Sequence, residues 1–331
     1  MERIREMVLK DFTDLVSKVK SSGICKKIVV VAADDAHTIE AVMTAQKDGI
    51  VEPYFIGGSK GSADTIKKIL SDIGSDPNAF EIYEADDFDQ AAAIGAKLCS
   101  EGKGDFLMKG KLDTSQILRQ VLKPEANLSR PNGAMCHVAI NWAPSYHKLL
   151  LTTDGGMNVH PNFDMKLAEL VNSVNTLRAL GYENPKVAVL ANAEKLDPKV
   201  QESVDADTLK QMYVKGEIKN CIVEGPVALD IALVKERAEV KKFESPVAGD
   251  ADIILSPNLF TSNTLGKAIV ELAGGKMTGL IVGAKVPIIL TSRGSSSEEK
   301  YNSIVMAAAV AAGSENITNE DVADLAGRKF W

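Results

Sequence analysis

The sequence predicts an α/β protein whose sheet is mostly parallel. Short apolar runs, which are typical of buried strands, alternate along the chain with longer segments whose apolar residues follow helical spacing. Parallel strands need crossover connections, and helices usually supply them, so this alternation favours a sheet covered on both faces. The 331 residues are enough for two domains with a core each.

The first part of the chain follows this alternation closely. Residues 2–20 carry apolar side chains at helical spacing among many charges, which indicates an amphipathic helix and not a signal peptide. The loop 109–115 is basic, bears hydroxyls and leads into a helix that carries Arg119. Further strands are expected at 28–33, 53–56, 81–83 and 105–108, and further helices at 36–47, 63–73 and 89–100.

The middle of the chain contains an antiparallel connection. Residues 134–142 and 148–153 are expected to form two strands joined by a short turn. Cys136 and His137 are neighbours on the first of them and should point to opposite faces, so they cannot form a nucleophile–base pair. The following sequence, which begins Asp154-Gly155-Gly156, predicts a chain reversal, and we place a domain crossover close to it.

The remaining chain returns to alternating strands and helices. Strands are expected at 186–190, 221–223, 252–255, 279–282 and 286–290. Helices are expected at 163–180, 206–215, 261–273, 298–312 and 318–325.

Charge and cysteine content exclude several classes of protein. The net charge of −7 argues against non-specific nucleic-acid binding. The four cysteines are widely spaced, which favours a reducing cytoplasm over a disulfide framework or a zinc site. No apolar run approaches the roughly 20 residues that a membrane span needs, so we expect a soluble cytoplasmic protein.

The end of the strand expected at 286–290 is the strongest functional signal. It runs into Thr291-Ser292-Arg293-Gly294, and a serine-rich helix start follows. This arrangement puts backbone N–H groups, hydroxyls and a fixed cation at the carboxyl end of a strand, where α/β sheets bind anions. We therefore expect a site for a phosphate-bearing substrate here.

Several segments together resemble the phosphate acetyl/butyryltransferase family. They include LMKGKLDTSQILR (107–119), PSYHKLLLTTD (144–154), KNCIVEGPVALD (219–230), NTLGKAIVELAGG (263–275) and GLIVGAKVPIILTSR (279–293). The likeness extends over nearly the whole chain, and its motifs occur in the family's order. It is closer to the butyryl branch than to the acetyl branch.

The resemblance implies a reaction, a fold and partners. The reaction is acyl-CoA plus phosphate going reversibly to acyl phosphate plus CoA, by direct transfer in a ternary complex without a metal or a bound cofactor. The fold is two α/β domains with a cleft between them, similar to isocitrate and isopropylmalate dehydrogenases. We expect residues 1–154 with 295–331 to form the first domain and residues 155–294 the second. A homodimer or a larger homo-oligomer is implied.

The resemblance also assigns roles to particular residues. Arg293 would bind the transferring phosphate and stabilise charge, and Ser292 would position CoA or phosphate. Arg119 would contact CoA or phosphate, which suits the planar fork of an arginine. Thr114 and Ser115 are further candidates for binding substrate, although either hydroxyl can instead cap the helix that they begin.

Three further candidates also have structural explanations. Glu299, with Glu298 beside it, occupies the position of the proposed base, but Ser296 and Glu299 also fit a capping box. Lys285 lies in a turn, from which it would either reach phosphate or remain exposed. Asn263 precedes a helical pattern and either caps that helix or contacts ligand.

Other functions remain open at this point. An acetyltransferase of the same family would differ in the walls of the acyl pocket, which the sequence does not identify. A dehydrogenase of the same fold would need a cluster of metal-binding aspartates on a helix, and none is evident. A non-catalytic CoA-binding module would not need Arg293 and Arg119.

Overall fold

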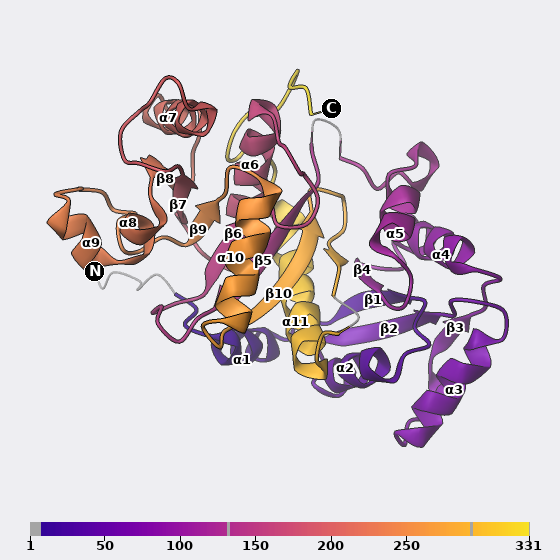
Figure 1. The fold of residues 1–331 in the computed structure, drawn as a ribbon. Coiled ribbons are helices and arrows are strands. Elements are labelled where there is room, and N and C mark those ends of the chain that lie inside the picture. The colour runs from indigo at the N-terminus through magenta and orange to yellow at the C-terminus, as the bar shows by residue number, and fades with distance from the viewer. Residues whose placement is uncertain (1–7, 131–132, 292–293, 331) are drawn as a thin grey trace. The chain divides into compact units, whose positions relative to one another are not determined.

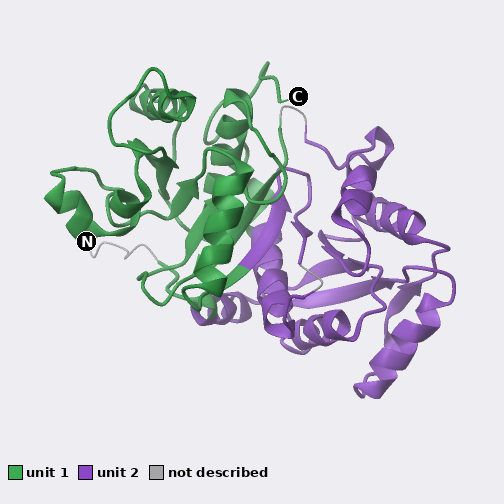
Figure 2. Cartoon of the chain, in the orientation of Figure 1, with its two compact units in different colours: residues 1–12, 132–277, 313–331 green, residues 13–131, 278–312 purple. Residues whose placement is uncertain are grey.

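The chain folds into two compact units, each built from segments that are distant in the sequence. The computed structural model describes residues 8–130, 133–291 and 294–330. Unit 1 consists of residues 1–12, 132–277 and 313–331, and unit 2 of residues 13–131 and 278–312 (Figure 2). The predicted domain division, 1–154 with 295–331 against 155–294, groups the chain differently and stays a prediction.

Unit 2 contains a mainly parallel sheet in the order β3-β2-β1-β4-β11-β10 (Figure 1). Strand β10, of which residues 278–282 belong to this unit, runs antiparallel to β11, and the other neighbours run parallel. The strands are β1 (Lys26–Val31), β2 (Val51–Ile56), β3 (Glu81–Tyr83), β4 (Phe106–Lys109), β10 (Lys276–Val282) and β11 (Ile288–Ile289).

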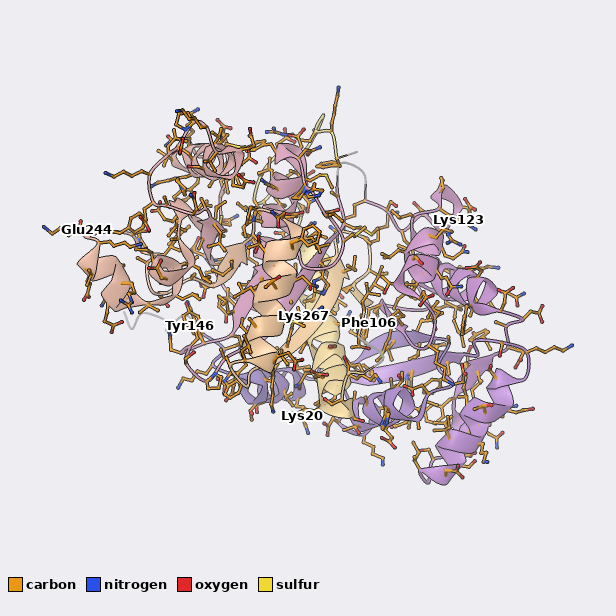
Figure 3. All side chains as sticks on the ribbon, viewed as in Figure 1. Lys20, Phe106, Lys123, Tyr146, Glu244 and Lys267 are labelled. Carbon is orange, nitrogen blue, oxygen red and sulfur yellow. The ribbon has the colours of Figure 1, made fainter. Side chains whose placement is uncertain are left out.

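Helices cover this sheet and supply its crossovers. Gly95 lets α4 approach the sheet closely, because a Cβ built there would lie 2.6 Å from Val31 and 3.3 Å from Leu107. The fully buried Phe106 lies on β4 in the core of the unit (Figure 3). The helices are α1 (Phe12–Ser22), α2 (Ala36–Lys47), α3 (Ser62–Asp72), α4 (Phe88–Ser100), α5 (Thr114–Val121) and α11 (Ser297–Gly313), with 3-10 turns at Pro77–Ala79 and Pro124–Ala126.

Unit 1 contains strands in the order β5-β6-β9-β7-β8. The predicted antiparallel pairing of β5 with β6 is confirmed, and β6, β9, β7 and β8 run parallel to one another. The strands are β5 (Cys136–Trp142), β6 (Leu150–Thr153), β7 (Lys186–Leu190), β8 (Ile222–Val227) and β9 (Ile253–Leu255).

Two long helices pack on opposite faces of β5. Cys136 faces α6, where its Sγ lies 3.4 Å from Asn172 Nδ2. Asn141 is an odd number of residues further along the strand and therefore faces the other side, where Gly266 of α10 lies against it. The helices of this unit are α6 (Phe163–Ala179), α7 (Gln201–Val214), α8 (Leu229–Leu233), α9 (Lys235–Val240) and α10 (Leu259–Glu271), with a 3-10 turn at Ser314–Asn316.

One sequence expectation about elements is wrong, and two short helices were missed. Residues 318–325 form turns and not a helix, because the tail's polar groups bond elsewhere: Lys219 N donates to Val322 O at 2.8 Å and Asn220 Nδ2 to Asp321 O at 2.7 Å. Helices α8 and α9 were not expected, since five or six residues are too few to show a helical period.

The expected N-terminal helix lies partly outside the described residues. Within them, α1 begins at Phe12, and its apolar residues Phe12, Leu15 and Val19 are buried, as the spacing predicted. No helix in the described part of the chain is both long and apolar enough to cross a membrane.

Candidate active site

The carboxyl ends of β1, β4 and β11 meet at one edge of the unit 2 sheet, because these strands run parallel. A polar loop follows each strand there: residues 32–35, 110–113, and 290–296 with 292–293 outside the description. We call these loops the polar edge. Ligands of α/β proteins bind outside the carboxyl ends of strands, so the polar edge is the candidate site.

The loop after β4 lies directly against the end of β1. Gly110 N donates to Val31 O at 2.8 Å, and Lys111 N donates to Ala32 O at 3.0 Å. A Cβ built on Gly110 would lie only 2.1 Å from Ala32 O, which backbone atoms cannot accommodate without moving. A glycine is therefore required for the two loops to meet.

Lysine ammonium groups gather at the polar edge. Lys111 Nζ lies 3.0 Å from Asp34 Oδ2, and Lys300 Nζ lies 3.4 Å from Asp35 Oδ2. Lys109 is buried, and its Nζ donates to the carbonyls of Gly110 at 3.2 Å and Leu112 at 3.1 Å. The edge thus combines cations with fixed carboxylates, which suits the reversible binding of an anion such as phosphate.

Asp35 anchors one of these cations. Its side chain caps α2 by accepting from Thr38 N at 2.9 Å. Burial opposes ionisation of this carboxyl, but the hydrogen bonds from Thr38 and the charge of Lys300 outweigh it, so the pKa of Asp35 is lowered. Asp35 is consequently ionised at neutral pH and can hold Lys300 in place.

Thr114 and Ser115 begin α5 at the polar edge, but neither caps the helix. The N-cap is Asp113, and Gln116 Oε1 accepts from Asp113 N at 3.0 Å. The expected Thr114 or Ser115 cap is therefore wrong, because Asp113 and Gln116 form the capping box instead. Both hydroxyls remain outside the cap, at the positive end of the helix.

Arg119 lies further along α5 and contacts α4. Its NH1 atom is 3.7 Å from Asp89 Oδ2, and its side chain is 60% exposed. An exposed ion pair at this distance contributes little to stability. The guanidinium is therefore only weakly held and accessible to an anionic ligand.

Glu299 takes part in the predicted capping box of α11. Ser296 N donates to Glu299 Oε2 at 2.9 Å, and Glu299 N donates to Ser296 Oγ at 3.1 Å. This reciprocal pair satisfies two N–H groups at the helix start. Ser292 and Arg293, the most strongly indicated catalytic residues, lie outside the described residues.

Lys285 lies at the opposite edge of the unit 2 sheet. It precedes β11, and β11 runs parallel to β4, so this turn is at the amino ends of those strands. Its N–H donates to Leu128 O at 2.7 Å, and its Nζ donates to Asn127 Oδ1 at 2.8 Å. The structure does not bring Lys285 together with Thr114 and Glu299.

Asn263 belongs to unit 1 and does not cap α10, contrary to expectation. The cap is Asn258, whose Oδ1 accepts from Thr261 N at 3.0 Å, because the helix begins earlier than its apolar pattern suggested. The amide of Asn263 instead donates to Gly155 O at 2.9 Å. This contact ties it to the reversal after β6.

That reversal is held by one carboxylate. Asp154 Oδ1 accepts from Gly156 N at 2.8 Å and Met157 N at 2.9 Å, and its Oδ2 accepts from Asn158 N at 3.1 Å. A Cβ on Gly156 would lie 3.0 Å from the His137 ring, so the turn is also closely packed. Asp154 therefore fixes the backbone on which Asn263 depends.

A second, fully buried carboxyl supports the same turn. Glu169 Oε1 accepts from Asn158 Nδ2 at 3.1 Å. Burial and the nearby charge of Asp154 raise the pKa of Glu169 to about 8, although the bond from Asn158 and the charge of Lys166 oppose the shift. At neutral pH this carboxyl is mostly protonated.

Polar atoms without a partner surround the turn. Among the described residues, His137 Nδ1, Ser256 Oγ and Ser262 Oγ are buried and have no hydrogen-bond partner. Each unpaired buried group costs about 1–3 kcal/mol, so such groups usually need a functional explanation. The turn and the start of α10 are accordingly a second candidate region, carried by unit 1.

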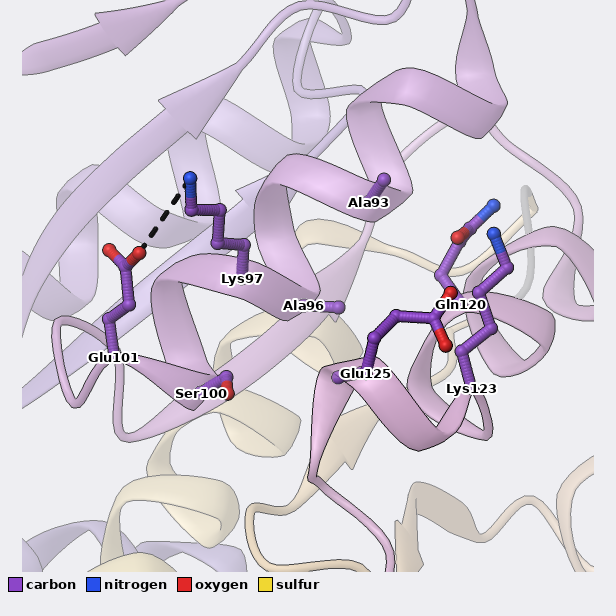
Figure 4. Close-up of a pocket in the computed structure, with 9 residues that line it drawn as sticks. Ala93, Ala96, Lys97, Ser100, Glu101, Gln120, Lys123 and Glu125 are labelled. Atoms are coloured by element: carbon purple, nitrogen blue, oxygen red, sulfur yellow. Dashed lines mark ion pairs between the residues drawn. The ribbon is translucent and has the colours of Figure 1, made fainter.

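Two hollows have linings that share no residue with the polar edge. One, of about 440 Å³, lies between α4, α5 and the 3-10 turn that follows, where the exposed Lys97 pairs with Glu101 at 3.8 Å (Figure 4). The other, of about 380 Å³, lies in unit 1 at the ends of β7 and β9. In the described part of the chain, no group of three or more His, Cys, Asp or Glu residues is placed to hold a metal ion.

Sequence reasoning missed Asp34, Asp35 and Lys300 at the polar edge. The first two were detectable in principle, because two acidic residues directly follow the apolar run of β1. Lys300 gave no signal, since its pairing with Asp35 joins residues 265 positions apart.

Comparisons with known proteins agree with the resemblance found in the sequence. The family model described as phosphate acetyl/butaryl transferase matches residues 66–308. The chain is 40% identical over 304 residues to a phosphate butyryltransferase of Clostridium acetobutylicum, covering 92% of this chain and 99% of that one. It is 35% identical over 297 residues to a phosphate acetyltransferase of Thermotoga maritima, covering 90% and 98%.

Solved structures extend the comparison to the fold. A branched-chain phosphotransacylase of Enterococcus faecalis matches with a TM-score of 0.75 and 28% identity, over 86% of this chain and 99% of that one. A 4-hydroxythreonine-4-phosphate dehydrogenase of Klebsiella pneumoniae matches with a TM-score of 0.51 at 12% identity, over 86% and 99%. The second likeness concerns the fold alone and agrees with the expected dehydrogenase-like architecture. With a family model across residues 66–308 and relatives aligned over nearly their full length, the chain belongs to the phosphate acetyl/butaryl transferase family.

Proposed function

We propose that the chain is an acyltransferase that catalyses the reversible reaction of acyl-CoA with phosphate to give acyl phosphate and CoA. The observation that carries this proposal is the 40% identity to a phosphate butyryltransferase over 92% of this chain and 99% of that one. The preferred substrate is butyryl-CoA or another short acyl-CoA. Acetyl-CoA is the second candidate, because a phosphate acetyltransferase is 35% identical over a similar span.

The chemistry requires a held phosphate, a stabilised oxyanion and a group that gives the departing CoA sulfur its proton and takes that proton back when CoA attacks in the reverse direction. A phosphate oxygen attacks the thioester carbonyl, the C–O bond forms, and the C–S bond breaks to release CoA; the reverse direction forms C–S and releases phosphate. Donors aimed at the developing oxyanion provide a large share of such catalysis. Holding both substrates together supplies several kcal/mol more.

We assign the phosphate to the polar edge of unit 2. Its lysines supply positive charge, and the hydroxyls of Thr114 and Ser115 stand at the start of α5 outside its cap. Arg293 would hold the transferring phosphate and Ser292 would position CoA, both on the family resemblance. Arg119, weakly paired with Asp89, would turn to the phosphates of CoA.

The other candidate residues have less support. Glu299 remains a candidate base, although its carboxylate already caps α11. Asn263 is proposed to accept a hydrogen bond from CoA through its Oδ1 atom, because its Nδ2 atom already donates to Gly155 O. Lys285 remains a candidate phosphate ligand without structural support, since it follows β10 and bonds Asn127.

The first experiment is a thiol-release assay. Butyryl-CoA and acetyl-CoA are each incubated with the protein, with and without inorganic phosphate, and free CoA is followed with a thiol reagent. We expect phosphate-dependent release that is faster with butyryl-CoA. Faster release from acetyl-CoA would keep the family activity and change the substrate, whereas no phosphate-dependent release from any short acyl-CoA would contradict the proposed function.

Matched arginine variants test the assigned site. Arg293→Ala should lower kcat by roughly 10²-fold or more, because a charge-stabilising donor is lost. Arg237→Ala, which changes an exposed arginine on α9, is the control and should leave kcat unchanged. Equal activity of the two variants would remove Arg293 from the catalytic site.

We further propose a cytoplasmic homo-oligomer, most simply a dimer, that uses CoA only as substrate and product. The cysteines are unpaired, which suits a reducing compartment. Light scattering coupled to size exclusion would measure the mass, and a purely monomeric protein at micromolar concentration would contradict the oligomer.

A further inference from the structure

An apolar cavity of about 380 Å³ lies in unit 1 at the carboxyl ends of β7 and β9. Leu190 ends β7, Pro257 follows β9, and the first turns of α7 and α10 complete the walls. Both strands belong to the parallel part of the sheet. The cavity therefore occupies the kind of position at which α/β sheets bind ligands, and it has the size of a small-molecule pocket.

The walls of this cavity are fixed by the core of unit 1. Leu190 is only 7% exposed and belongs to a buried cluster with Val227 and Ile254. Leu229 and Leu265, which line the cavity, pack against the same cluster. A cavity whose walls are anchored in this way exists before a ligand arrives, so binding costs little reorganisation.

The polar groups of the cavity select the ligand's charge. Asn192 and Glu202 line it, and neither side chain has a hydrogen-bond or ion-pair partner among the described residues. The third polar residue, Thr261, already bonds Asn258 Oδ1 at 3.0 Å through its hydroxyl. The carboxylate of Glu202 accepts hydrogen bonds and disfavours anions, so a ligand whose polar end donates hydrogen bonds fits it best.

We propose that this cavity binds a small aliphatic ligand whose polar end donates hydrogen bonds, as an amine, an alcohol or an amide does. Carboxylates and phosphates are excluded by Glu202, which distinguishes this site from the phosphate site assigned to the polar edge. The aliphatic part of the ligand lies against Leu190, Leu229 and Leu265, and the donor contacts Glu202 and Asn192. The site is carried by unit 1 alone and does not depend on the proposed acyl transfer.

Three probes with one hydrocarbon test the proposal: 3-methylbutylamine, 3-methylbutan-1-ol and 3-methylbutanoate. Their dissociation constants are measured on the full chain by ligand-observed NMR titration at pH 7. We expect the amine to bind tightest, the alcohol next, and the carboxylate at least tenfold more weakly than the amine. No binding by any probe, or equal binding by all three, would overturn the proposal.

Variants of Glu202 change which probe the cavity prefers without filling the cavity. Glu202→Gln should weaken the amine to about the affinity of the alcohol and leave the alcohol within about threefold. Glu202→Lys should reverse the order and favour the carboxylate. An unchanged order in both variants would show that Glu202 does not contact the ligand, which contradicts the assigned site.

Two tryptophan substitutions, one within α10 and one at its C-cap, test the location of the site. Leu265→Trp fills the cavity and should abolish binding of all three probes, whereas Leu272→Trp places the same ring at an 87% exposed position and should leave binding intact. Circular dichroism of both variants checks their folding, and the Glu202 variants decide the question if Leu265→Trp does not fold. If no probe binds the parent protein and Leu265→Trp changes the oligomeric mass, the cavity belongs to a contact between copies of the chain. That result would contradict the proposal.

Discussion

Gly110 shows how a single missing side chain shapes the polar edge. Because a Cβ there would lie 2.1 Å from Ala32 O, Gly110→Ala forces either the loop after β1 or the loop after β4 to move. We expect a loss of about 1–3 kcal/mol in the free energy of unfolding, as for other overpacked sites. Catalytic activity should fall as well, since this loop leads to Thr114 and Ser115. Urea denaturation and the thiol-release assay measure the two effects.

Gly266→Ala is the matched control for that substitution. Its Cβ would meet Met277 Sδ at 3.0 Å, and a methionine side chain can move away. The position is inside α10, where alanine is favoured over glycine by about 1 kcal/mol. We therefore expect no loss of stability; a loss equal to that of Gly110→Ala would show that close approach to backbone is not the cause.

Glu169 predicts a pH dependence of stability. Its pKa is raised from 4.5 to about 8 in the folded chain, so between these values the folded protein keeps a proton that the unfolded chain releases. Stability must then fall as the pH rises through this range, by up to about 1.4 kcal/mol per pH unit from this group. Glu169→Gln cannot ionise and keeps an oxygen for Asn158, so its stability advantage over the parent should grow from pH 5.5 to pH 7.5.

Denaturant unfolding at the two pH values measures this difference. Glu244→Gln, at an exposed position in unit 1, serves as the control and should show no pH-dependent advantage. If the Glu169→Gln and parent proteins lose stability in parallel, the buried carboxyl does not titrate in this range.

At the level of elements, variants at the start of α11 can distinguish a capping role of Glu299 from a catalytic role. Ser296→Ala and Glu299→Ala should each cost about 1 kcal/mol, because each removes one half of the capping box. Glu299→Gln keeps an acceptor for Ser296 N but loses the charge. We expect this variant to retain both stability and activity, which is the result for a residue that only caps the helix. Full stability with activity reduced more than tenfold would instead identify Glu299 as the base.

Strands and long helices were predictable because their patterns are local. The helix 36–47 and the strand 186–190 have the expected bounds, since burial sets a clear period or an apolar run in each. The short strand 81–83 also has the expected bounds, although none of its residues is buried. Helix starts were less predictable. The caps expected of Thr114 or Ser115 and of Asn263 are instead formed by Asp113 and Asn258. Several residues that can cap a helix occur within a few positions of each start, and the sequence does not rank them.

The candidate site was predictable only to the extent that the ends of strands could be located in the sequence. Thr114 and the loop after β11 were found because polar residues follow apolar runs, and parallel strands bring such loops to one edge. Lys285 was considered because it lies in the turn between two expected strands, but β10 runs antiparallel to β11, which puts this turn at the other edge. The short connection between β10 and β11 could have indicated this direction, as the short turn between β5 and β6 did for that pair.

At the scale of the whole molecule, each compact unit is completed by distant segments. Residues 313–331 belong to unit 1 although residues 278–312, directly before them, belong to unit 2. The tail contributes buried Val322 and Leu325, and Arg328 NH1 lies 3.0 Å from Asp164 Oδ1 of α6. The turns of this tail have no sequence pattern of their own, and the helix that the sequence suggested at 318–325 is not formed.

Removal of residues 317–331 should therefore loosen unit 1 selectively. The truncated chain loses the bonds from Lys219 N to Val322 O and from Asn220 Nδ2 to Asp321 O, together with the buried apolar side chains of the tail. We expect faster hydrogen exchange in peptides from α6 and the start of β8, and unchanged exchange in β1 and β4. Glu320→Ala, at an exposed position of the same tail, should leave both sets of peptides unchanged. Equal acceleration in both units would mean that they unfold as one cooperative body, and the division into two compact units would then carry no energetic meaning.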